Sequence, residues 1–322
     1  MKLSMIKSLW GCSEVNDKKQ WSSLFTRIKK EGYEGVETIG LTYLLEDFVK
    51  ILADFNLKLI CQIHTTGGYI ENNEYVYCTT TSLSAHLESF RSQLVQALTV
   101  NPYMINIHSG HDSWSIDMAV QYFEQCFAIE KELLVGAYAD IVVVHETHRQ
   151  RLFYSPYQTR ELLLHPALHG KLRINADLSH WCCVCEKVFD SDDPRDAWWQ
   201  EVLDLVAKHA YYIHCRIGHS EGPQVFDPRD PQWQKERSLH LIWWLTIWIN
   251  QEKRGFKQTL CAPEHGPHPY QFYGDSMPNS NTSNNIFQAY EVKDADKDLI
   301  LWDINNFVKD EVKDLFEQQR SI

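Results

Sequence analysis

The 322-residue sequence predicts an α/β protein, a single (β/α)8 barrel that spans residues 1–322. Short apolar runs alternate with longer segments of helical spacing, and strict alternation of this kind is typical of a parallel sheet. The alternation repeats eight times, which gives about 40 residues per unit, a slightly enlarged barrel of this class. A doubly wound open sheet is the alternative. It is disfavoured because Gly11-Cys12-Ser13, after the first strand, is unlike a glycine-rich phosphate turn.

Eight apolar runs are predicted to be strands, and the clearest is 140–146, where Ile141 is followed by three valines. The runs are 6–10, 35–38, 58–64, 104–108, 140–146, 172–177, 210–214 and 259–264. The segments between them repeat apolar residues three and four positions apart, as helices do. The predicted helices lie near 21–28, 44–55, 82–98, 115–134, 156–164, 195–208 and 232–251, with closing helical material that ends near 316. Pro156 suits the first turn of its helix, and a polar loop is expected over 274–285.

The composition excludes several classes of protein. Lys plus Arg number 31 and Asp plus Glu number 43, and the resulting net charge of −12 disfavours tight binding to nucleic-acid phosphates. No run approaches the roughly 18 consecutive apolar residues of a membrane-spanning helix, and the first residues lack the apolar centre of a secretion signal. The nine cysteines are an odd number and suit free thiols. We therefore expect a cytoplasmic protein without a nucleic-acid or membrane partner.

Charged and imidazole side chains end most of the predicted strands. In a (β/α)8 barrel the chemistry lies at the C-terminal ends of the strands, so these side chains should meet at one mouth. They are Glu37, His64, His108, Glu146, His148, Asp177, His180, His214, Arg216, Glu264 and His265. Four of them form the candidate metal site, namely Glu146, Asp177, His214 and Glu264. Three converging carboxylates with one imidazole would repel one another without a cation, and they suit one divalent ion such as Mn²⁺, Mg²⁺, Co²⁺ or Zn²⁺. The alternative to a metal site is that these four residues form buried ion pairs that only stabilise the ends of the strands.

The order of these residues, Glu146, Asp177-x-x-His180, His214-x-Arg216 and Glu264, resembles that of the xylose-isomerase-like TIM-barrel superfamily. The segment 32–37 is similar to the family as well. This superfamily is of the sugar phosphate isomerase/epimerase type and contains sugar epimerases and isomerases such as tagatose 3-epimerase and hydroxypyruvate isomerase. It also contains inosose and 3-dehydroshikimate dehydratases and endonuclease IV. The resemblance covers the whole chain in order and spacing, and it identifies the superfamily better than the reaction.

The resemblance implies that the quartet holds the metal, and that His180 and Arg216 contact substrate oxygens. It also implies that Glu146 and Glu264 act as acid and base on opposite sides of the substrate. We expect His64 and His108 to line the substrate pocket. The function expected is a metal-dependent isomerase or epimerase of carbohydrate metabolism. It would take a proton from the carbon beside the carbonyl of a small polyhydroxylated substrate, through a metal-stabilised enediolate.

Three alternatives stay open at this point. The same residues would serve a dehydratase if a β-hydroxyl leaves instead. An endonuclease IV-like nuclease would bind three zinc ions, but Arg229 stands where that family has a histidine, and the chain is acidic. A metal-free binding barrel is disfavoured because no member of the quartet is missing.

Two further features lie outside the quartet. The segment 216–231 holds three prolines and two glycines, and we expect a rigid loop that covers the substrate, with His219 and Arg229 as candidate contacts. The segment 241–249 is apolar almost all round, so either the C-terminal helix or a second subunit must cover it. We predict a homodimer on this basis.

Overall fold

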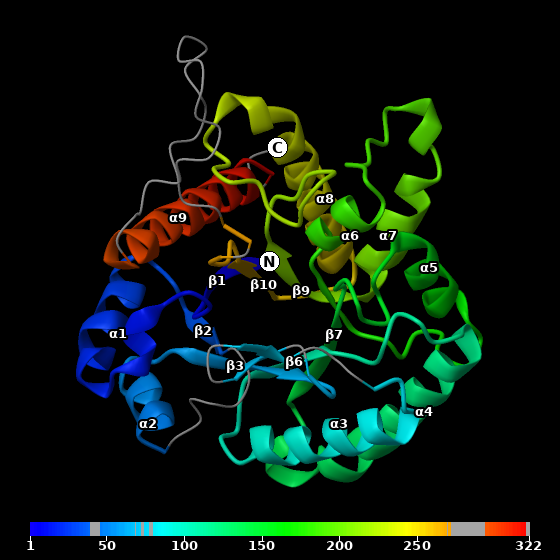
Figure 1. The fold of residues 1–322 in the computed structure, drawn as a ribbon, viewed down its shortest axis with the longest axis horizontal. Coiled ribbons are helices and arrows are strands. Elements are labelled where there is room, and N and C mark those ends of the chain that lie inside the picture. Colours follow the sequence, from blue (N-terminus) through cyan, green and yellow to red (C-terminus); the bar gives the residue numbers. More distant parts are fainter. Residues whose placement is uncertain are drawn as a thin grey trace.

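Eight parallel strands close into a barrel in the computed structural model, as the sequence predicts (Figure 1). Around the barrel the strands follow the order β1-β10-β9-β8-β7-β6-β3-β2. Their bounds are β1 (Lys2–Ser8), β2 (Gly35–Thr38), β3 (Lys58–His64), β6 (Met104–His108), β7 (Val142–Glu146), β8 (Ile174–Ala176), β9 (Ala210–Cys215) and β10 (Gln258–Pro263). The structure describes residues 1–38, 46–67, 69–71, 74–76, 80–268, 270–271 and 294–319. The predicted loop over 274–285 and Cys78 lie outside these ranges.

Helices surround the strands on all sides (Figure 1). Their bounds are α1 (Trp21–Lys30), α2 (Glu46–Asp54), α3 (Leu83–Leu98), α4 (Ile116–Leu133), α5 (Pro156–Leu164), α6 (Ser179–Val184), α7 (Trp199–His209), α8 (Gln234–Lys253) and α9 (Asp294–Gln319). Three of these helices begin at a serine whose side chain accepts a backbone N–H of the first turn. These serines are Ser82, Ser115 and Ser155. Pro156 occupies the first turn of α5, where its missing N–H costs nothing.

The first strand runs over Lys2–Ser8 rather than 6–10, and four further elements differ from the sequence-based expectations. The sixth strand is short because the chain turns at Asp177, whose side chain accepts from the backbone N–H of Ser179. The short helix α6 follows at once and is too brief to show a helical period in sequence. Residues 194–196 form a 3-10 turn, so α7 begins at Trp199. The antiparallel hairpin of β4 (Tyr69–Glu71) and β5 (Glu74–Val76) is an insertion between β3 and α3.

The interior of the barrel has an apolar lower layer and a polar upper layer. The apolar layer consists of Ile6, Ile60, Met104, Val144, Tyr212, Leu260 and Ala262. Side chains alternate along a strand, so residues two positions further along the same strands also point inward. Glu146 follows Val144 in this way, and His214 follows Tyr212. The apolar layer therefore forms a floor that excludes water beneath the polar residues of the mouth.

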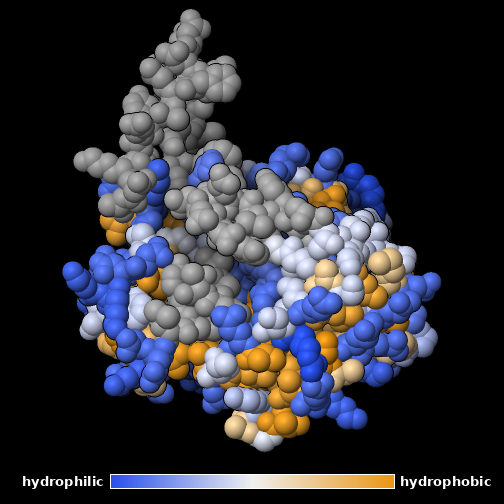
Figure 2. Space-filling model, turned by 60° about the horizontal axis from the view of Figure 1, so that its bottom comes forward, coloured by the Kyte–Doolittle hydropathy of each residue, from blue (hydrophilic) through white to orange (hydrophobic). Residues whose placement is uncertain are grey.

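The C-terminal helix α9 packs beside α8, which is one of the two arrangements expected for the apolar segment 241–249. The rings of Trp248 and Phe316 meet edge to face at 5.3 Å, and Arg237 lies 3.7 Å from Glu311. Ile242 keeps 49% of its surface exposed. Figure 2 brings forward the side at the bottom of Figure 1, away from α8, and hydrophobic residues gather toward the lower edge of that face. The homodimer stays a prediction. Within the described ranges, no helix is long and apolar enough to cross a bilayer.

Candidate metal centre

The four residues of the predicted quartet meet at the mouth of the barrel. One ligand atom from each of Glu146, Asp177, His214 and Glu264 lies within 4.8 Å of the others, and all four residues are buried. Nδ1 of His214 is central: it lies 2.9 Å from Oε2 of Glu264, 3.6 Å from Oε2 of Glu146 and 3.9 Å from Oδ2 of Asp177. Glu146 and His214 lie on β7 and β9, and Asp177 and Glu264 directly follow β8 and β10; these four strands are consecutive around the barrel.

Glu37 at the end of β2 holds His214 from the opposite side. Its Oε2 accepts hydrogen bonds from Nε2 of His214 at 2.8 Å and from the hydroxyl of Tyr212 at 2.9 Å. Its Oε1 accepts from Nδ2 of Asn106 at 3.0 Å. Because a carboxylate only accepts, Nε2 of His214 carries a proton, and Nδ1 faces the three other carboxylates.

Two asparagines of the inner face position Glu146. Its Oε2 accepts from Nδ2 of Asn106 at 2.6 Å and from Nδ2 of Asn175 at 3.2 Å. Asn106 lies on β6 and Asn175 on β8, so the strands on both sides of β7 hold this one oxygen atom. Nε2 of His108 lies 3.1 Å from the same oxygen. The side chain of Glu146 is therefore fixed before any ligand binds.

Arg216 and Ser179 position Asp177. Arg216 donates from Nη2 to Oδ2 of Asp177, and its Nε donates to Oγ of Ser179 at 3.1 Å. Nη2 of Arg216 also lies 2.6 Å from Nε2 of His180, which is 3.5 Å from Asp177. Arg216 and His180, both predicted to contact substrate, thus adjoin the quartet.

Burial and charge set the protonation of the quartet. Burial alone would raise the pKa of Glu146, but the neighbouring histidines outweigh it and hold this pKa well below its usual value. Burial raises the pKa of Asp177 to about 6, against the opposing effect of the adjoining guanidinium. Burial would lower the pKa of His214, but the carboxylates on both sides raise it well above its usual value. His214 therefore carries a positive charge that offsets part of the negative charge around it.

These residues fit a divalent cation. Nδ1 of His214 is buried and, among the described residues, makes no hydrogen bond of acceptable geometry, although a carboxylate oxygen lies 2.9 Å away. A cation at this position would replace the proton on Nδ1 and would neutralise carboxylates that otherwise face one another. Three carboxylates and one imidazole nitrogen match the preferences of hard or intermediate divalent ions.

Four histidines form a row of tilted rings beside the quartet. The ring centres of His64 and His108 are 4.2 Å apart, those of His108 and His148 are 4.3 Å apart, and those of His148 and His180 are 3.9 Å apart. Burial is the main cause that lowers the pKa of His64, His148 and His180, so these rings are neutral. Both nitrogens of His64 lack a hydrogen-bond partner in the described part of the chain. His108, Glu146 and His148 also form a second group with the spacing of metal ligands.

The two loop candidates lie apart from the quartet. His219 forms a short antiparallel bridge with Gly222 and packs against Trp233, with ring centres 5.0 Å apart. Arg229 pairs with Asp227 at 2.8 Å and is partly exposed. None of the contacts made by the described residues joins His219 or Arg229 to the quartet, so their role over the substrate stays a prediction.

Sequence reasoning did not assign roles to several residues of the site. In sequence, Asn106, Asn175 and Tyr212 are ordinary members of predicted strands, and Glu37 is only a polar strand end. The alternation of side chains along each strand was the available signal, because Asn106 lies two residues before His108 and Tyr212 two before His214.

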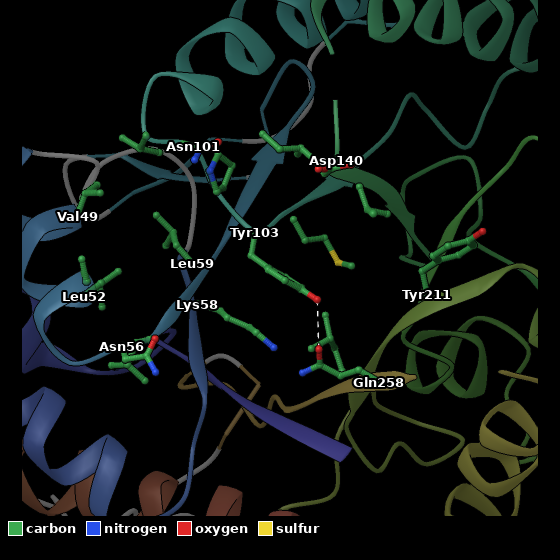
Figure 3. A pocket seen from close by; sticks show the side chains of 18 of the residues that line it. Val49, Leu52, Asn56, Lys58, Leu59, Asn101, Tyr103, Asp140, Tyr211 and Gln258 are labelled. Carbon is green, nitrogen blue, oxygen red and sulfur yellow. Dashed lines mark hydrogen bonds between the residues drawn. The ribbon is translucent and has the colours of Figure 1, made fainter. Parts of the chain in front are cut away.

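A cavity of about 910 Å³ opens at the opposite end of the barrel (Figure 3). It lies at the N-terminal ends of the strands, and the hydroxyl of Tyr103 donates to Oε1 of Gln258 at 3.3 Å across it. Nζ of Lys58 lies 4.6 Å from the centre of the Tyr103 ring. None of the quartet lines this cavity, and residues at this end of such barrels usually serve stability.

No family model and no curated protein matches the chain. Several solved structures are similar to the chain in fold. The IolI protein with a bound zinc atom is 12% identical with a TM-score of 0.55, over 96% of this chain and 98% of that one. A putative xylose isomerase from Rhodospirillum rubrum is 13% identical with a TM-score of 0.52, over 96% and 97%. An AP endonuclease of family 2 from Brucella melitensis is 13% identical with a TM-score of 0.52, over 83% and 93%. The structural neighbours are thus xylose-isomerase-like TIM-barrel proteins, and the shared property is the fold.

Proposed function

We propose that this protein is a divalent-metal-dependent isomerase or epimerase that acts on a small polyhydroxylated carbonyl compound. The observation that carries the proposal is the convergence of four buried ligand atoms, from Glu146, Asp177, His214 and Glu264, within 4.8 Å of one another. The IolI protein, which has a similar fold, is described with a bound zinc atom, and this supports a metal in a barrel of this fold.

A divalent ion bound here would polarise the carbonyl and an adjacent hydroxyl of the substrate and would stabilise the negative charge that develops during proton removal. Carboxylate side chains of the protein would transfer the proton. Among the described residues, Oε1 of Glu146 and Oε1 of Glu264 accept no hydrogen bond, whereas the Oε2 atoms face the asparagines, His214 and Arg216. Each Oε1 is therefore free to take or return a proton.

The fate of the proton decides the reaction. Its return to the same carbon from the opposite face gives an epimer, and its return to the neighbouring carbon gives an aldose–ketose isomer. Loss of a β-hydroxyl gives dehydration, so a dehydratase is the alternative. In each case His108, His180 and Arg216 stand around the ligand cluster and would orient the substrate hydroxyls.

Elemental analysis of the purified protein tests the metal centre. We expect about one Mn, Mg, Co or Zn ion per chain in the wild type, and loss of this ion in Asp177→Asn and His214→Ala. His169→Ala changes an exposed histidine outside the site and is the matched control. Absence of metal after incubation with Mn²⁺ or Zn²⁺ contradicts the proposal.

Solvent deuterium then separates the two reactions. Deuterium at carbon in recovered sugar without loss of water supports the isomerase or epimerase, whereas a dehydrated product supports the alternative. Three zinc ions per chain would favour a nuclease, for which the second ligand group of His108, Glu146 and His148 is the supporting feature. Arg229 in its ion pair with Asp227 and the net charge of −12 weigh against that function.

A further inference from the structure

Arg149 lies at the edge of the metal centre, although it belongs to none of the groups described so far. It follows Glu146 by three positions, in the loop between β7 and α5, and it is half-buried. Its guanidinium carbon is 4.8 Å from the centre of the Tyr270 ring, and that of Arg216 is 5.3 Å from the same ring. Because Arg216 donates to Asp177, the shared aromatic ring places Arg149 at the same mouth of the barrel as the quartet.

The other described arginines have oxygen partners. Eight lie within 4.0 Å of a carboxylate: Arg27, Arg91, Arg160, Arg173, Arg195, Arg216, Arg229 and Arg237. Arg151 and Arg254 donate to backbone carbonyls. In the described part of the chain, no carboxylate or carbonyl oxygen accepts a hydrogen bond from the guanidinium of Arg149.

The thiol of Cys183 is the polar group that adjoins Arg149, and it does not neutralise the charge. Burial raises the pKa of the Cys183 thiol, and the positive charge of Arg149 beside it only opposes this rise. Sγ of Cys183 donates to the carbonyl of His180 at 3.2 Å. A half-buried guanidinium without a counter-charge is costly, and this chain has 43 acidic side chains that could have supplied one.

We propose that Arg149 binds a carboxylate group of the substrate, so that the substrate is a sugar acid: a polyhydroxylated carbonyl compound with one carboxylate. This inference rests on the proposed function and names the substrate class of the same site. The planar fork of a guanidinium matches both oxygens of a carboxylate. A phosphate dianion is less well matched, because Arg149 supplies one charge and neighbouring Arg216 is already paired with Asp177.

Binding measurements on the Mn²⁺-loaded protein test this assignment. Calorimetric titrations compare D-glucuronate with D-glucose and D-galacturonate with D-galactose, and D-glucose 6-phosphate represents the phosphate. We expect the wild type to bind at least one acid about tenfold or more tightly than its neutral counterpart. Arg149→Gln abolishes this preference, and Arg149→Lys keeps part of it because lysine retains the charge without the fork. Arg160→Gln, which removes an exposed arginine of α5 paired with Glu201, is the matched control and keeps the preference.

Mn²⁺ affinity and thermal unfolding are measured first on every variant, so that a folding defect or a lost metal is recognised. Failure of the wild type to bind Mn²⁺ contradicts the proposed function itself. Normal Mn²⁺ binding with no preference for either acid, or with no binding of either acid, overturns only the assignment to Arg149. A preference that survives in Arg149→Gln overturns it as well. Tighter binding of the phosphate ester than of both acids would contradict the proposal that Arg149 binds a carboxylate group.

Discussion

Nε2 of His214 donates a 2.8 Å hydrogen bond to Oε2 of Glu37, across the floor of the barrel mouth. This bond keeps a proton on Nε2 and fixes the direction of the ring, so that Nδ1 faces Glu146, Asp177 and Glu264. Glu37 is therefore a positioning residue for the proposed metal centre, although it contributes no atom to the ligand group.

Glu37→Gln should weaken metal binding without removing a ligand. An amide can donate to Nε2 and can thereby stabilise the wrong tautomer of His214. We expect Mn²⁺ affinity to fall by about 10- to 100-fold, measured by calorimetry. Tyr212→Phe removes only one of the hydrogen bonds to Glu37 and should cost less. Unchanged affinity in Glu37→Gln would remove this residue from any positioning role.

Glu146→Gln and Glu264→Gln should each lower turnover of the eventual substrate by orders of magnitude, because each replaces the oxygen proposed to carry the proton. Both residues also face the metal position, so bound metal must be measured in the same samples. Glu124→Gln, in α4, is an exposed control that should retain full turnover. A variant that keeps its metal and a near-normal rate is not an acid or base in this reaction.

The barrel could be predicted from sequence because its units repeat one pattern. Residues 35–38, 58–64 and 104–108 are strands at the positions that their apolar runs indicate. The quartet could be found because each member lies within one residue of the end of a strand, and the topology brings such ends together. The short helix α6 and the hairpin of β4 and β5 could not be found, since neither is long enough to show a period.

The hydrogen bonds that organise the site depend on three-dimensional neighbours. Asn106 reaches both Glu37 and Glu146 from a strand that adjoins only one of theirs. In the sequence, Asn106 cannot be distinguished from any other polar residue within a strand. The absence of an oxygen partner for Arg149 in the described residues is likewise a property of the folded chain, because acidic residues are plentiful in the sequence.

Gly266 should tolerate no side chain. A Cβ atom there would lie 2.1 Å from Cζ3 of Trp10, whose ring meets Tyr270 edge to face at 4.9 Å. Gly266→Ala should therefore displace Trp10 and lower the free energy of unfolding by about 1–3 kcal/mol, measured in urea. In the background of Trp10→Ala the same substitution should cost much less, because the obstructing ring is gone. Strictly additive costs would show that the close approach to Trp10 is not the cause.

Glu130 in α4 should make stability fall as the pH rises. Burial raises its pKa from 4.5 to about 7, and Arg173, 3.8 Å away, opposes this only in part. His145 lies 3.9 Å away, but burial lowers its pKa to about 3, so it stays neutral and offers no charge.

Because the pKa of Glu130 is higher in the folded than in the unfolded chain, its contribution to stability is fully present below about pH 4.5. That contribution is lost as the pH rises through about 7, at a cost on the order of 3 kcal/mol. Glu130→Gln removes the ionisation. We expect the variant to match the wild type near pH 5 in urea unfolding and to exceed it near pH 8. Glu124→Gln, an exposed position of the same helix, should show no such pH dependence. Equal stability of wild type and Glu130→Gln near pH 8 would mean that Glu130 ionises as easily in the folded protein as in the unfolded chain.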